Sequence, residues 1–193
     1  MNDGELLEWM KTADIRSIQD RLDRLKFVRG HHPAENGHLF FGGPIPVQAF
    51  LEMQFCYIHG AYISCTLAAQ VVLEHLFAAV LEWNGRDGLD RAGFKALSEA
   101  ALSEGLISQY EFDEFERLRG IRNPYAHSKP FMGDSCVVRR SAESGLAPNE
   151  LVKEDAQQAL AIVIRILSRQ PFPFPSADTG RAGLDAAPDG GGT

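Results

Sequence analysis

The sequence predicts an all-α fold, a bundle of about five or six helices, on the basis of three observations. Apolar residues recur at the three- and four-residue spacing of a helix through most of the 193 residues. Glycine and proline are mostly clustered between these segments. Residues 47–83 form a long apolar stretch without proline, typical of the central helices of a bundle.

Length and composition indicate one globular domain with short additions at both ends. Hydrophobic residues make up 45% and charged residues 23% of the chain. We predict an N-terminal helix and extended loop over residues 1–45, the bundle over 46–172 and a disordered tail over 173–193. The chain starts without the basic flank and apolar core of a signal peptide, and its three cysteines lack a disulfide framework. We therefore expect a cytoplasmic protein.

The first helix is predicted over residues 3–27, where isoleucine and leucine recur at helical spacing between charges. A loop rich in glycine, proline and histidine follows, with a short extended piece at residues 38–41. His31, His32, Glu35 and His38 could form a metal cluster, but their spacing is not that of a known site, and an ordinary polar loop is the alternative.

Residues 47–83 are predicted to form two helices or one long bent helix. The second half is apolar almost all round, and Thr66, Gln70 and Glu74 form its single polar stripe, so we expect a buried central helix. Polar residues in the middle of the run argue against a membrane span. Cys56, His59 and Cys65 share a face, for which core packing or zinc binding are the two interpretations.

Three further helices and one strand are predicted in the second half of the chain. Asp90 would cap a helix running to about Glu104, and Ser108 with Glu111 forms a capping box for the next helix. Residues 136–140 would form a strand that pairs with residues 38–41, and apolar periodicity over 150–169 predicts the last helix.

The most specific motif lies at the end of the helix that Ser108 caps. Arg122 follows Phe115 and Leu118 on one face, so it should point inward or towards a partner helix. Pro124 disfavours helical backbone at Asn123, so we predict a break there, with Asn123 capping a new turn. The break would let Arg122 and His127 converge. The alternative is a helix-capping arginine and an ordinary histidine.

Basic residues cluster around this motif although the net charge of the chain is −7. Residues 116–140 contain six basic side chains against two acidic ones, which suits a local anionic ligand. Arg119 and Lys129 lie in this segment and are candidate substrate-binding residues. The net negative charge of the chain argues against a surface that is basic throughout and suited to nucleic acid. Solvated helix faces are the alternative explanation.

The motif R-N-P-Y-A-H and the helices before and after it resemble the HEPN superfamily, over roughly residues 60–170. These helical domains carry an arginine, often followed by a polar residue, and a histidine four to six residues further on. The resemblance implies a homodimer and, in active members, RNA cleavage without a metal or other cofactor. It assigns catalytic roles to Arg122, Asn123 and His127.

Two functions are compatible with this resemblance. The first is a metal-independent endoribonuclease of the defence or toxin type, with RNA as substrate and no membrane partner. RNA cleavage by the 2′-hydroxyl needs a base, an acid and a cation, which a histidine from each of two copies and an arginine can supply. The second is a non-catalytic HEPN-like module that binds nucleotide or protein. The sequence does not identify an antitoxin partner.

Overall fold

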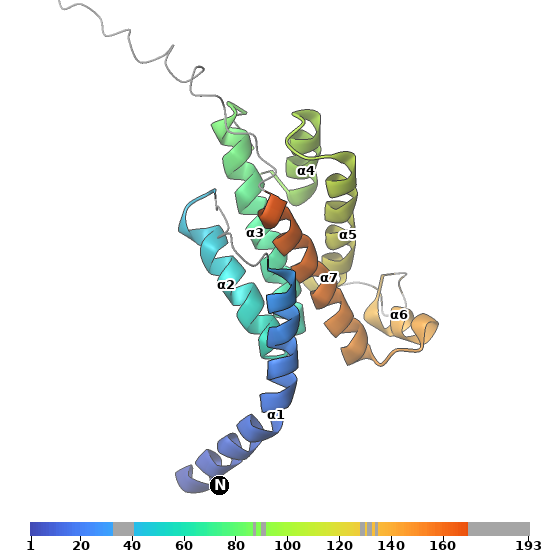
Figure 1. The fold of residues 1–193 in the computed structure, drawn as a ribbon. Helices are drawn as coiled ribbons and strands as arrows, with labels where there is room; N and C mark the ends of the chain where they lie inside the picture. Colours follow the sequence, from blue (N-terminus) through green and yellow to red (C-terminus); the bar gives the residue numbers. More distant parts are fainter. Residues whose placement is uncertain are drawn as a thin grey trace, which may run out of the picture.

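The described residues form an all-α bundle (Figure 1), which confirms the predicted fold class. The computed structural model describes residues 1–32, 41–86, 88–89, 92–127, 130, 133 and 135–169. Within them the helices are α1 (Asp3–His31), α2 (Pro44–Ile58), α3 (Tyr62–Trp83), α4 (Phe94–Ser103), α5 (Gln109–Ala126), α6 (Val137–Ser144) and α7 (Pro148–Arg169).

The core lies around α3, which packs against α2, α4, α5 and α7. Its apolar side chains are buried along almost the whole helix, from Cys65 to Leu81. α7 shares the central position and buries Ala159, Leu160 and Val163. By length and composition alone α3 could cross a membrane, but half of its most apolar window is buried inside the bundle. The predicted central helix is therefore confirmed, with α7 as a second one.

The stretch over residues 47–83 is divided into two helices by a turn at Gly60. Gly60 has a φ of 82°, which favours glycine because it lacks a Cβ atom. The N–H of Ala61 then bonds to the carbonyl of Cys56, and α3 begins at Tyr62. Of the two predicted alternatives, the structure therefore has the pair of helices.

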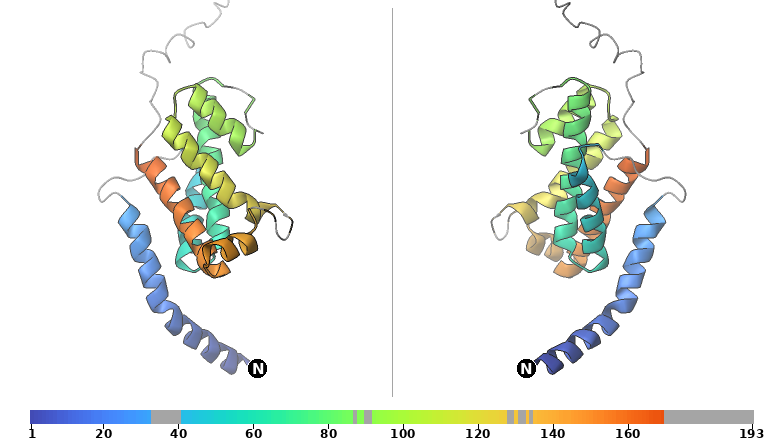
Figure 2. Two further views of the ribbon diagram at one scale, coloured as in Figure 1. Left: turned by 90° about the vertical axis from the view of Figure 1, so that its right-hand side faces the viewer. Right: turned by 90° about the vertical axis from the view of Figure 1, so that its left-hand side faces the viewer.

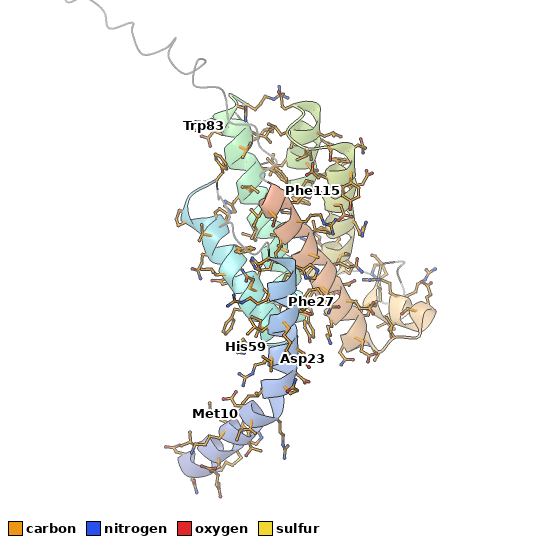
Figure 3. All side chains as sticks on the ribbon, in the orientation of Figure 1. Met10, Asp23, Phe27, His59, Trp83 and Phe115 are labelled. Atoms are coloured by element: carbon orange, nitrogen blue, oxygen red, sulfur yellow. The ribbon has the colours of Figure 1, made fainter. Side chains whose placement is uncertain are left out.

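α1 continues to His31, four residues beyond the predicted end, and only its second half lies on the bundle. Arg24 Nε donates to the carbonyl of Ile58 at 2.7 Å, and Val28 is buried. The first half extends away from the other helices (Figure 2), and Met10 lies on this part (Figure 3). Because α1 has 29 residues and α2 has 15, the first half of α1 extends past the helix it packs on.

The predicted strand at residues 136–140 is wrong, since this segment begins α6. Two adjacent valines suggest a strand, but Arg139 pairs with Glu143 one helical turn later at 2.7 Å. Gly145 ends the helix in the left-handed conformation, with a φ of 74°. The helix after residue 90 is also shorter than predicted, because α4 starts at Phe94 with Gly93 as its N-cap.

Some predictions fall on residues outside the described ranges. These are the extended piece at residues 38–40, the cap at Asp90, the possible metal ligands Glu35 and His38, and the tail over 173–193.

Candidate functional site

α5 presents the arginine–histidine motif and is held at its start and its middle. Ser108 N donates to Glu111 Oε2 at 2.8 Å and the N–H of Glu111 donates to Ser108 Oγ at 3.3 Å, which confirms the capping box. Phe115, labelled in Figure 3, is buried with its ring edge-on to Phe77 at 4.8 Å. The predicted apolar stripe therefore fixes the face of α5 from which Arg122 projects.

The predicted break at Asn123 is wrong, because α5 continues through Pro124 to Ala126. Proline lacks an N–H and crowds the preceding turn, but only two helical residues follow it here. The N–H of His127 donates to the carbonyl of Asn123 at 3.1 Å, so Asn123 is part of the final turn and not a new N-cap. The change of direction comes at His127, whose φ of −130° and ψ of 137° are extended.

This extended residue brings the imidazole back to the arginine. Arg122 Nη1 lies 3.0 Å from His127 Nε2 and 3.3 Å from Asn123 Oδ1. Because a guanidinium has hydrogen-bond donors only, Nε2 must be the acceptor. The ring hydrogen of a neutral His127 then lies on Nδ1. The structure thus brings the three predicted catalytic residues together, by a C-terminal turn and not by a break in the helix.

Tyr125, one of the four residues between Arg122 and His127, anchors the end of α5 to α7. Its hydroxyl donates to Asp155, which is 1% exposed and also accepts from Arg140 Nη1 at 2.8 Å and Nη2 at 2.7 Å. Burial and the hydrogen bond to Asp155 raise the pKa of Tyr125, and the same carboxylate raises the pKa of Arg140. Three helices, α5, α6 and α7, therefore meet at one carboxylate directly behind the motif.

In front of the motif, an open pocket of about 500 Å³ lies between α3, α4 and α5. Arg122, Asn123, His127 and the predicted substrate-binding Arg119 line it. Lys129, the other predicted substrate-binding residue, lies outside the described ranges. The remaining polar lining residues were not predicted to belong to the site: Gln70 and Glu74 of α3, and Lys95 and Glu99 of α4.

A signal for the α3 residues was present in the sequence. Gln70 and Glu74 interrupt an otherwise apolar helix, and they lie one turn apart. Gln70 Nε2 donates to Glu74 Oε1, and Gln70 is only 3% exposed. A buried glutamine bonded to a half-buried glutamate on a core helix is unusual and indicates a site on that face.

The possible metal sites receive no support from the described geometry. Within the described ranges, His, Cys, Asp and Glu side chains do not form a group of three suited to a metal ion. Cys65 is buried, which raises the pKa of its thiol, and Cys56 is half-buried. Cys65 packs in the core, which agrees with core packing and not zinc binding as the interpretation of this residue.

Comparison with known proteins gives no evidence about the function of these residues. Protein-family models, curated proteins and solved structures contain no match for this chain.

Proposed function

We propose that the protein is a metal-independent endoribonuclease of the HEPN type that uses Arg122, Asn123 and His127. The observation that supports this best is the 3.0 Å contact between Arg122 Nη1 and His127 Nε2 at the edge of an open pocket. The contact places a phosphate-binding cation next to a side chain that can transfer a proton near neutral pH.

The proposed reaction begins when an RNA phosphate enters the pocket and binds the guanidinium. Arg122 then turns from His127 to the phosphate oxygens, which frees the Nε2 lone pair. His127 takes the proton of the 2′-hydroxyl as this oxygen attacks phosphorus, and Arg122 stabilises the developing negative charge. Asn123 Oδ1 accepts from Nη1 of Arg122, which restricts the position of the guanidinium group.

The leaving 5′-oxygen needs a proton from an acid, which must be a group other than the histidine that acts as base. Among the described residues that line the pocket, His127 is the only histidine. A homodimer in which two motifs face one cleft would supply the second imidazole by twofold symmetry. The products would be a 2′,3′-cyclic phosphate and a 5′-hydroxyl.

A non-catalytic binding module is the second candidate, and one observation favours it. Nε2 of His127 accepts from Arg122, so the nitrogen that would act as base is occupied. The same pair could hold a nucleotide phosphate without proton transfer.

Incubation of the purified protein with mixed RNA in EDTA distinguishes the two functions. The nuclease predicts cleavage that EDTA does not inhibit and that leaves cyclic phosphate ends, detected by end-group analysis. RNA that is bound and left intact by the folded wild-type protein would support the binding module instead.

A further inference from the structure

Two of the charged side chains that line the pocket, Arg122 and Glu74, have neutral hydrogen-bond partners, whereas the other charged side chains are paired with an opposite charge. Lys95 pairs with Glu99 at 3.5 Å, and Arg119 pairs with Glu116 outside the pocket lining. Arg122, by contrast, bonds to Asn123 and His127. Glu74 accepts from Gln70, and among the described residues no basic group lies within ion-pair distance of it. Within the described part of the chain, the pocket therefore presents one cation on α5 and one anion on α3 that have no ion-pair partner.

Gln70 adds a second acceptor on the α3 side. Its Nε2 donates to Glu74, so the amide orientation is fixed, because exchanging its two atoms would set oxygen against oxygen. Oε1 is then buried without a donor. A buried acceptor without a donor is costly and indicates that a ligand group completes the site. Gln70 Oε1 and Glu74 Oε2 are thus two acceptors on adjacent turns.

This arrangement fits a ligand with an anion at one end and adjacent hydrogen-bond donors at the other. Among the RNA bases, guanine alone has two neighbouring N–H donor groups, N1–H and the N2 amino group, on its Watson–Crick edge. Adenine, cytosine and uracil each have only one donor group on that edge. A pocket of about 500 Å³ is within the range of small-ligand sites and can hold one nucleotide.

We infer that Glu74 and Gln70 select guanine in the nucleotide whose phosphate binds Arg122. The N1–H and N2 amino groups donate to the Glu74 carboxylate and the Gln70 amide oxygen, while the 3′-phosphate contacts Arg122 and His127. The inference rests on the proposed function for its biological meaning. It predicts that the RNA is cut on the 3′ side of guanosine.

Calorimetric titration of the full chain with 3′-GMP, 3′-IMP and 3′-AMP tests the inference without turnover. Wild-type protein should bind 3′-GMP at least about tenfold more tightly than 3′-AMP, in line with the discrimination that a bidentate contact provides. 3′-IMP, which lacks the N2 amino group, should fall between them. Glu74→Gln should remove the preference by weakening 3′-GMP alone. Equal affinities in the wild type, or a preference that survives Glu74→Gln, would overturn the inference.

The chain contains a matched control on α2. Gln48 Nε2 donates to Glu52 Oε1 at 2.9 Å with the same four-residue spacing, but this pair is exposed and lies outside the pocket. Glu52→Gln should leave all three affinities unchanged. Gln70→Leu removes the buried acceptor, so it should lower the preference for 3′-GMP without lowering the melting temperature; an unchanged preference would also count against the inference.

The two proposals fail in different ways. Selective binding of 3′-GMP by a protein that leaves RNA intact refutes cleavage and retains guanine selection. Cleavage of RNA after all four nucleotides equally refutes guanine selection and retains the nuclease.

Discussion

At the scale of single residues, the proposed reaction depends on the contact between Arg122 and His127. The guanidinium donates to Nε2, which keeps the imidazole oriented. Arg122 itself is half-buried and His127 is exposed, so the pair can separate without disturbing the core.

His127→Ala should reduce RNA cleavage by about 10²–10⁴-fold, the usual contribution of a general base or acid. The side chain is exposed, so the melting temperature should not change. His59→Ala is the matched control, because His59 is also an exposed residue directly after a helix but lies outside the pocket. Rates are measured with a fluorescent RNA. Equal rates for both variants would remove His127 from the chemistry.

Arg122→Lys should also reduce cleavage, by at least about tenfold, because lysine keeps the charge but lacks the planar fork that binds two phosphate oxygens. Arg117→Lys on the same helix serves as the control, since Arg117 pairs with Glu114 and does not line the pocket. If Arg122→Lys mainly lowers the melting temperature and leaves turnover intact, Arg122 is a structural residue.

The residues of the motif could be named from the sequence, but the way they meet could not. Proline usually ends a helix, which predicts a break at Asn123. In α5 the helix nevertheless continues for two residues beyond Pro124, and the turn occurs at His127. Glu74 and Gln70 belong to the site only because α3 lies beside α5, which local patterns do not reveal.

At the scale of elements, the end of α5 is fixed by Asp155 of α7. The Tyr125 hydroxyl and the Arg140 guanidinium occupy both oxygens of this buried carboxylate. Because Tyr125 lies between Arg122 and His127 in the chain, its anchor holds the turn that brings the pair together. Tyr125 is thus a positioning residue.

Tyr125→Phe should lower the free energy of unfolding by about 1–3 kcal/mol, the range for a hydrogen bond to a charged group and its loss. Urea unfolding measures this effect. The matched control is Tyr110→Phe, since Tyr110 lies on the same helix with an exposed hydroxyl that accepts from Arg165. The variant should also reduce cleavage at temperatures where it is fully folded. Unchanged cleavage there would show that the anchor serves stability alone.

Helix type and approximate extent could be predicted where apolar residues were frequent over a long segment, as in α3, α5 and α7. α6 has only eight residues, and its two valines outweighed the Arg139–Glu143 pair in the prediction of a strand. In α1 the apolar spacing correctly indicated a helix, but Ile15 and Ile18 are 69% and 53% exposed. Periodicity identifies an apolar face and does not show what covers it.

At the scale of the whole molecule, the described part of one chain places one histidine in its pocket. α4 and α5, whose residues help to line the open pocket, lie away from the first half of α1 in Figure 1. Cyclising cleavage needs both a base and an acid, so the full reaction calls for two copies.

We therefore predict a homodimer at micromolar concentration, with Arg122 and His127 of both copies near the twofold axis. Sedimentation equilibrium measures the assembly, and a dilution experiment tests the shared cleft. When wild-type protein exchanges subunits with a ninefold excess of His127→Ala chain, only about one tenth of wild-type chains remain in wild-type dimers. If one cleft needs both histidines, cleavage falls to about that fraction. Cleavage that does not fall, or a monomer in sedimentation, would mean that each motif acts alone, and the acid would then have to come from elsewhere in the same chain.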